Sequence, residues 1–137
     1  MTENEIAQQI VDAAFKIHKT LGPGLLESAY QAILIYELQK RGLKLEAEKQ
    51  VPVIYESIQL DIGFRADLIV EDKVIVELKS IEQIAPVHKK QLLTYLRLSD
   101  KRLGLLINFG APLIKDGITR IANQLDERPL LKPILNN

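Results

Sequence analysis

One stretch, Phe64 to Ser80, constrains the fold of this chain more than any other. Its sequence, FRADLIVEDKVIVELKS, has two strand-like halves on either side of a polar centre, Glu71 to Lys73. Alternation of apolar and other residues is typical of strands, whose side chains point in turn to the two faces of a sheet. The stretch therefore predicts a β-hairpin with its turn at residues 71–73.

This turn determines which residues lie opposite one another, because Val70 then faces Val74. One predicted face is apolar and consists of Phe64, Ala66, Leu68, Val70, Val74, Val76 and Leu78. The other face has Ile69 beside Ile75, Asp67 beside Glu77, and Arg65 beside Lys79. A shift of one residue would mix the two faces, so the pattern strongly specifies this register.

The second face brings two carboxylates, Asp67 and Glu77, to one position. Two acids directly opposite each other repel unless a cation lies between them, and hard oxygen ligands suit Mg²⁺ or Mn²⁺. Lys79 points the same way, placed to hold an attacking water or a developing phosphate charge. A ladder of surface salt bridges is the alternative. Because Ile69 and Ile75 share this face, it is not simply solvated, and we favour the metal site.

The rest of the chain predicts a single mixed α/β domain over residues 1–137. Apolar periodicity, a Gly-Pro-Gly break and a helix-starting proline predict helices at about 3–21, 25–41 and 86–99. Strands are expected at 50–56, 58–70, 74–78 and 102–109. Asp116-Gly117 between apolar residues predicts a hairpin near the end. The order is helix, helix, three strands, helix, then one strand or a short pair, with helices flanking a central sheet.

Composition excludes several classes of protein. The chain has no cysteine, so it forms no disulfide and no thiolate zinc site. It has no apolar run long enough to span a bilayer, and its N-terminus lacks the features of a secretion signal. We therefore expect a cytoplasmic protein without membrane contact. Eighteen basic and eighteen acidic residues give zero net charge, which argues against an extended nucleic-acid-binding surface but allows a local basic cleft.

Asp67 followed by Glu77-Leu78-Lys79 resembles the signature of the PD-(D/E)XK nuclease superfamily, an aspartate on one strand and Glu-x-Lys on the next. GLLESAY, at residues 24–30, matches Gly-x-x-Glu-x-x-Tyr and resembles the GxxExxY family of that superfamily. HKKQLLTYLRL and LGLLINFG are similar to the same family. The resemblance implies a restriction-endonuclease-like core, a central mixed sheet flanked by helices in the order α-α-β-β-β-α-β. The proline of the superfamily's name is absent, since Ala66 precedes Asp67.

The resemblance also implies roles for individual residues. Asp67 and Glu77 match the metal-binding acids, and Lys79 matches the catalytic lysine. Glu27 matches an additional acid near the metal, although an acid in the first turn of a helix is also favoured by the helix dipole. Gln91 matches a glutamine that some branches place against the site.

Three further residues are weaker candidates for contacts with substrate. Arg65 either binds a substrate phosphate or neutralises Asp67. His88, one turn before Gln91, either contacts substrate or is an exposed helix histidine. Tyr30 is expected to be a packing residue with its hydroxyl near the site. His18 is expected to be structural.

The function implied is phosphodiester hydrolysis in nucleic acid, DNA more than RNA, with Mg²⁺ or Mn²⁺ as cofactor. One alternative is a catalytically silent nucleic-acid-binding module, favoured by the small size and neutral charge. Another is a homodimeric interaction protein, because the second helix, LLESAYQAILIYEL, is apolar around much of its circumference. The complete set of two acids and a lysine favours the nuclease.

Overall fold

The computed structural model describes residues 1–125, except the side chain of Ile62. Residues 126–137, which the predicted domain includes, lie outside the described part. The described elements are α1 (Glu3–Leu21), α2 (Glu27–Lys40), β1 (Leu45–Tyr55), β2 (Ile58–Val70), β3 (Val74–Lys79), α3 (Pro86–Ser99), β4 (Leu103–Asn108), α4 (Ile114–Gly117) and β5 (Ile118–Ala122). The described strands form one five-stranded sheet in the order β1-β2-β3-β4-β5. The predicted mixed α/β architecture is confirmed.

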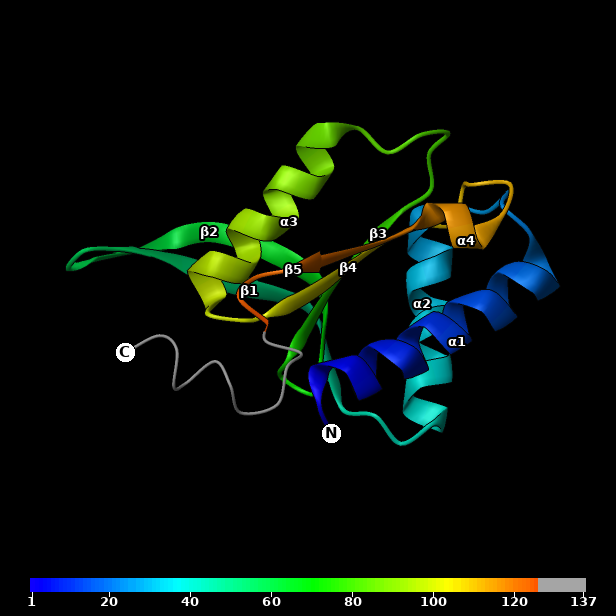
Figure 1. The fold of residues 1–137 in the computed structure, drawn as a ribbon, viewed down its shortest axis with the longest axis horizontal. Coiled ribbons are helices and arrows are strands. Elements are labelled where there is room, and N and C mark those ends of the chain that lie inside the picture. The colour runs from blue at the N-terminus through cyan, green and yellow to red at the C-terminus, as the bar shows by residue number, and fades with distance from the viewer. Residues whose placement is uncertain (126–137) are drawn as a thin grey trace.

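The two faces of the sheet are covered by different helices (Figure 1). α1, α2 and α4 pack on one face, against alternate residues of the central strands such as Leu105 and Ile107. α3 packs on the other face through Leu92 and Leu96. Gly104 of β4 permits this close packing, because an added Cβ there would lie 2.9 Å from Leu92. No helix in the described part of the chain is long and apolar enough to cross a membrane.

The register predicted for the β2–β3 hairpin is confirmed. Val70 pairs with Val74, Ile69 with Ile75 and Leu68 with Val76, in antiparallel fashion. β3 then pairs in parallel with β4, and β4 is antiparallel to β5. The hairpin therefore lies at the centre of the sheet.

The continuous apolar face predicted for this hairpin is wrong at its open end. Leu68 and Val70 pack under α1 and α2, but Phe64 and Ala66 belong to the cluster under α3. The pairs with β3 end at Leu68, and before that residue β2 pairs only with β1. A two-stranded ribbon twists more than a wide sheet, so residues that share a face by parity reach different cores.

The hairpin predicted at Asp116-Gly117 is also wrong. Residues 114–117 form the short helix α4, and β5 follows it directly. Gly117 is required by a close approach, because an added Cβ would lie 2.3 Å from the carbonyl oxygen of Asn108. This contact is with the last residue of β4, outside the dipeptide and its flanking apolar residues, which explains why the local pattern indicated a turn.

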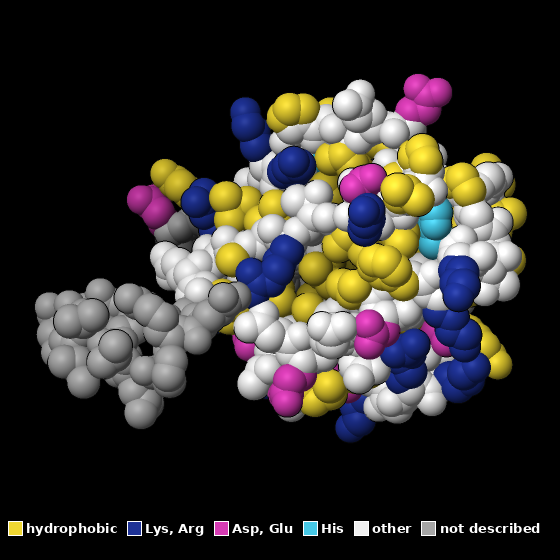
Figure 2. Space-filling model, turned by 45° about the vertical axis from the view of Figure 1, so that its right-hand side comes forward, with side chains coloured by type: hydrophobic (Ala, Val, Ile, Leu, Met, Phe, Trp, Pro, Cys, Tyr) yellow, Lys and Arg dark blue, Asp and Glu magenta, His cyan; other side chains and the backbone are white. Residues whose placement is uncertain are grey.

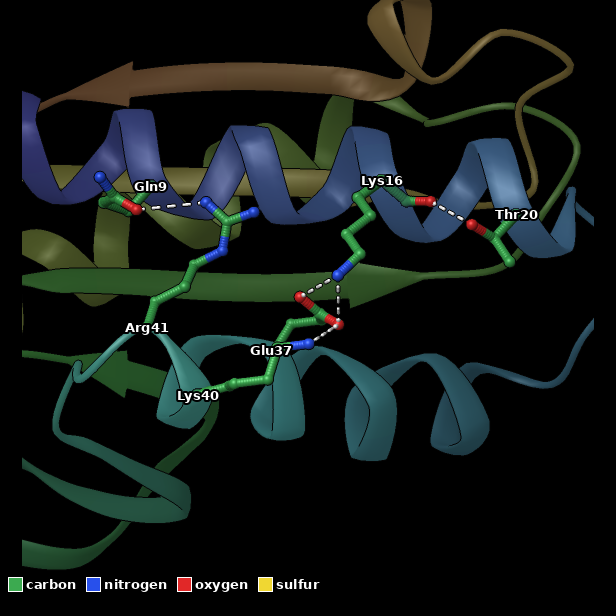
Figure 3. A network of polar contacts seen from close by, with 6 residues as sticks. All are labelled: Gln9, Lys16, Thr20, Glu37, Lys40 and Arg41. Carbon is green, nitrogen blue, oxygen red and sulfur yellow. Dashed lines mark hydrogen bonds and ion pairs between the residues drawn. The ribbon is translucent and has the colours of Figure 1, made fainter.

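α1 and α2 are joined by polar contacts as well as by apolar packing (Figure 3). Lys16 Nζ donates to both carboxylate oxygens of Glu37, at 3.2 and 3.1 Å. Arg41, directly after α2, donates to Gln9 of α1 at 3.2 Å, while Lys40 lies 3.7 Å from Glu37 within α2 itself. The bonds of Lys16 and Arg41 fix α2 against α1 and so help to set the position of its first residue, Glu27.

The β1–β2 hairpin extends beyond the helices at one end of the long axis (Figure 1). Its pairing changes register between Val51 and Val53. Gly63 lies opposite this irregularity, where an added Cβ would be only 1.7 Å from the carbonyl oxygen of Val51. We call residues 53–60, beyond the irregularity, the arm.

Candidate active site

The predicted acids lie together where β2 and β3 part. The N–H of Asp67 donates to Glu77 Oε2 at 2.8 Å, and the N–H of Leu78 donates to Asp67 Oδ2 at 2.8 Å. Each carboxylate thus accepts a hydrogen bond from the backbone of the other strand. These two bonds continue the connection between the strands beyond the last backbone pair, Leu68 and Val76, and they hold both acids in the opening.

Burial and mutual repulsion change the ionisation of this pair. Burial raises the pKa of Glu77 to about 8, and the nearby charge of Asp67 acts in the same direction. Burial also raises the pKa of Asp67, although its hydrogen bond from Leu78 acts against this. At neutral pH the pair of carboxylates therefore retains a proton. A divalent cation would compete with that proton for the same oxygens.

The donor chemistry of the pair fits a hard divalent cation. Asp67 and Glu77 each use one carboxylate oxygen in the bonds between strands. Two carboxylates with further lone pairs are suitable ligands for Mg²⁺ or Mn²⁺. Within residues 1–125, however, no group of three or more His, Cys, Asp or Glu side chains is arranged to hold a metal ion. Glu27 therefore does not complete a three-carboxylate set in this arrangement.

Glu27 nevertheless lies close enough to influence both acids. It is the first residue of α2, and its charge contributes to the raised pKa of Asp67 and of Glu77. The helix thus brings a third acid toward the strand opening, on the side away from α3.

Lys79 ends β3, pairs in register with Asn108 of β4, and is partly buried. Its charge lowers the pKa of both acids, which places it near them. Among the described residues it has no ion-pair partner within 4 Å. The ammonium group is therefore close to the acids without being bound to either.

Two site residues were missed from the sequence. Gln31 Nε2 donates to the carbonyl oxygen of Asp67 at 3.1 Å and to the carboxylate of Glu48 at 3.2 Å. Gln31 lies one turn after Glu27, so helical spacing alone could have indicated that both face the sheet. Glu48 has a positive φ of 53° inside β1, an uncommon conformation for which the sequence carries no signal.

The opposite side of the site is formed by Tyr95 of α3. Its ring stacks on Phe64, with ring centroids 3.9 Å apart. Burial raises the pKa of Tyr95, and the charges of Glu77 and Asp67 add to this effect. Tyr95 therefore lies near the acids and separates them from the core under α3.

Gln91, which the resemblance places against the site, lies on the outer side of α3. Gln91 is exposed, and so is Val87 one turn before it, at 51%. Leu92 and Leu96 are the buried residues of α3. Gln91 stands one turn before Tyr95 at the surface, so it lies at most on the rim of the site.

The weaker candidates have other partners. Arg65 is exposed, and the acid it pairs with is Glu48, at 3.9 Å, not Asp67. The Nδ1 atom of His88 accepts a hydrogen bond from the N–H of Ala85 at 3.1 Å, which caps the start of α3.

Tyr30 is fully buried and stacks on Phe109. Its hydroxyl donates to the carbonyl of Gly22 and accepts from the N–H of Leu25. Ser80, directly after Lys79, donates to the carbonyl of Leu25 at 2.7 Å. These contacts fasten the loop that leads into Glu27 and do not expose Tyr30 to a substrate.

His18 is buried, with its Nε2 atom 2.8 Å from the carbonyl oxygen of Ala111. This position is structural, as the sequence indicates. The two histidines of the chain therefore both make structural contacts with the backbone.

Comparison with known proteins gives one result. A family model described as the PD-(D/E)XK nuclease superfamily matches residues 4–121. No curated protein and no solved structure matches the chain. The mixed sheet with helices on both faces agrees with the restriction-endonuclease-like core of that description.

Proposed function

We propose that this chain, which belongs to the PD-(D/E)XK nuclease superfamily, is a metal-dependent nuclease that hydrolyses phosphodiester bonds. The observation that supports this most is the partly buried Asp67–Glu77 pair with raised pKa values and Lys79 beside it. Strongly perturbed acids next to a lysine are typical of functional sites. We assign the chain to the GxxExxY type within the superfamily, with Gly24, Glu27 and Tyr30 as the motif residues.

In this proposal Asp67 and Glu77 hold Mg²⁺ or Mn²⁺ once the shared proton is lost. The bound ion supplies a more acidic water and stabilises charge on the scissile phosphate. Lys79, which is near the acids but not paired with them, stabilises charge that develops on the phosphate in the transition state.

Other residues then act around this centre. Glu27 assists the metal-binding acids from the start of α2, and Gln31 positions the backbone of Asp67 through its hydrogen bond. Arg65 and Gln91 are exposed near the site and contact the substrate. The substrate is nucleic acid, DNA in preference to RNA, and the protein acts in the cytoplasm.

A second candidate is a nucleic-acid-binding module of the same fold without turnover. The absence of a group of three or more possible metal ligands within residues 1–125 favours it. Cleavage assays separate the two functions.

The test compares the wild type with Asp67→Asn, Glu77→Gln and Lys79→Ala on single-stranded, duplex and branched DNA and on RNA. We expect cleavage only with Mg²⁺ or Mn²⁺, and a loss of about a hundredfold or more in each variant. Calorimetry should show that Lys79→Ala still binds metal while the acid variants do not. Asp100→Asn and Lys44→Ala, at exposed positions, are matched controls that should keep full activity.

One result of this experiment would refute the nuclease proposal. If the folded wild type cleaves none of these substrates with either metal, the nuclease proposal is wrong. Retained binding of nucleic acid would then make the silent module the better description.

A further inference from the structure

The arm carries an apolar face that nothing in the described residues covers. Val53 pairs with Leu60 and Tyr55 with Ile58, so all four side chains lie on one face of the ribbon. Tyr55 is 66% exposed and Ile58 55% exposed. A two-stranded hairpin with so much exposed apolar surface is marginally stable by itself, and such surfaces mark interaction sites.

The charges on the arm and directly after it are negative. Between Gln50 and Phe64 the sequence contains Glu56 and Asp61 and no lysine or arginine. Glu56 stands in the turn at the tip. The arm therefore presents apolar side chains together with negative charge.

A hollow at the other end of the molecule has the complementary character. It lies between α1 and α4, has a volume of about 380 Å³, and is lined by Phe15, Lys16, His18, Lys19, Leu113, Ile114 and Lys115. Phe15 and Leu113 are 43% and 56% exposed. Figure 2 turns this end of the molecule forward and shows hydrophobic side chains gathered on the surface, with Lys and Arg side chains and some Asp or Glu side chains around them.

The charges around the hollow are positive. Lys16 is already paired with Glu37. Lys19 and Lys115 have no ion-pair partner within the part of the chain that the structure describes. An occupant with apolar side chains and a nearby acid would pack against the apolar walls of the hollow and form ion pairs with the lysines at its rim.

The arm has that chemistry, but it cannot reach the hollow of its own chain. The arm and the α1–α4 end lie at opposite ends of the longest axis (Figure 1). When two copies lie side by side in opposite directions, a two-fold axis perpendicular to the long axis places each arm beside the other copy's hollow. Such an arrangement closes with two equivalent contacts, as most homodimers do.

We propose that the chain forms a homodimer in which the arm of each copy occupies the hollow between α1 and α4 of the other. Apolar contacts of Tyr55 and Ile58 with Phe15 and Leu113 provide the buried area. Contacts between Glu56 and the lysines at the rim fix the orientation. This dimer does not depend on nuclease activity.

Site-specific cross-linking tests the contact directly, because the chain has no cysteine of its own. Two single-cysteine variants, Ser57→Cys at the tip of the arm and Lys115→Cys at the rim of the hollow, are mixed and oxidised. We expect a disulfide-linked species of twice the chain mass in the mixture, and much less in either variant alone. Thr94→Cys, exposed on α3, is the control partner and should give only background. Cross-linking no stronger than this background would overturn the proposal.

Charge exchange tests the orientation, measured by sedimentation over a range of concentrations. Glu56→Lys and Lys115→Glu should each raise the dissociation constant about tenfold. The two substitutions in one chain should restore most of the affinity, and circular dichroism should show that all variants are folded. A wild type that is monomeric at every concentration, or that grows beyond two copies, would contradict the closed dimer. So would single variants that dimerise like the wild type.

Discussion

The two ends of the β2–β3 hairpin are both largely buried, yet they are built from opposite chemistry. At the turn end, Leu68, Val70 and Val76 are buried apolar residues held by regular strand pairing. At the open end, the carboxylates of Asp67 and Glu77 accept the backbone hydrogen bonds. Buried backbone N–H groups need acceptors wherever strands part, so the acids have a structural place. Their burial, however, lowers stability at neutral pH, because the folded pair keeps a proton that the unfolded chain has lost. The turn end therefore supplies stability, and the open end supplies a group ready to bind a cation.

The largest effect on the free energy of unfolding should come from a substitution at the turn end of the hairpin. Leu68 is fully buried, so Leu68→Ala should lower the free energy of unfolding by about 2–5 kcal/mol through lost burial and a cavity. Urea unfolding followed by circular dichroism measures this. Ile58→Ala, on the exposed arm of the same strand, should change stability far less. If Leu68→Ala lowers the free energy of unfolding by less than about 1 kcal/mol, the turn end is not the main source of stability.

Glu77→Gln should have the opposite effect and raise the free energy of unfolding. The size of this effect should depend on pH. The folded protein holds the proton of Glu77 up to a pKa of about 8, whereas the unfolded chain loses it near the ordinary value of about 4.5. Wild-type stability should therefore fall as pH rises from 4.5 to 8, and the glutamine variant should lack this fall.

Above pH 8, without divalent ions, Glu77→Gln should be more stable than the wild type by on the order of 2 kcal/mol after screening by solvent. Thermal unfolding from pH 4 to 9 gives the comparison, with Asp100→Asn as the isosteric control. A variant less stable than the wild type at pH 9 would show that the carboxylate stabilises the fold.

Divalent metal should reduce the difference between what the turn end and the open end of the hairpin contribute to stability. At ten times its dissociation constant, Mg²⁺ should raise the free energy of unfolding of the wild type by about 1.4 kcal/mol. Glu77→Gln should show no such gain, because it lacks the charge that attracts the ion. Thermal shifts at matched ionic strength measure both. An equal gain in the two proteins would place the metal elsewhere.

The smallest effect should come from Gln31, which joins α2 to the open end. Gln31→Met keeps the size of the side chain but removes the donor to Asp67, so it should cost about 1 kcal/mol. Gln8→Met, on the exposed side of α1, is the matched control. If the nuclease proposal holds, Gln31→Met should also lower kcat more than it changes KM, which a purely structural role would not do.

The hairpin was predictable because its turn and its two faces constrain each other. Residues 71–73 fix the pairs from Leu68–Val76 to Val70–Val74, and a shifted register would bury charge throughout. The closeness of Asp67 and Glu77 followed from the same register. Local pattern carries this information because all the residues involved are close in sequence.

The errors concern contacts between distant segments. The core to which Phe64 belongs depends on the twist of β2 and on the position of α3. Gly117 packs on Asn108, and Gln31 reaches Asp67 across two elements. The positive φ of Glu48 depends on surroundings that strand periodicity does not report. These features arise from tertiary packing, which overrides local preference.

The parallel pair at the centre of the sheet has a consequence for the time course of folding. β3 and β4 form the one parallel pair among the described strands, and they are joined through α3. A parallel pair cannot close until its crossover is in place, so its chain entropy is lost before the contacts form. We therefore expect β3, α3 and β4 to form the folding nucleus, with substitutions there slowing refolding. The arm, formed by adjacent strands far from that nucleus, should affect only the rate of unfolding.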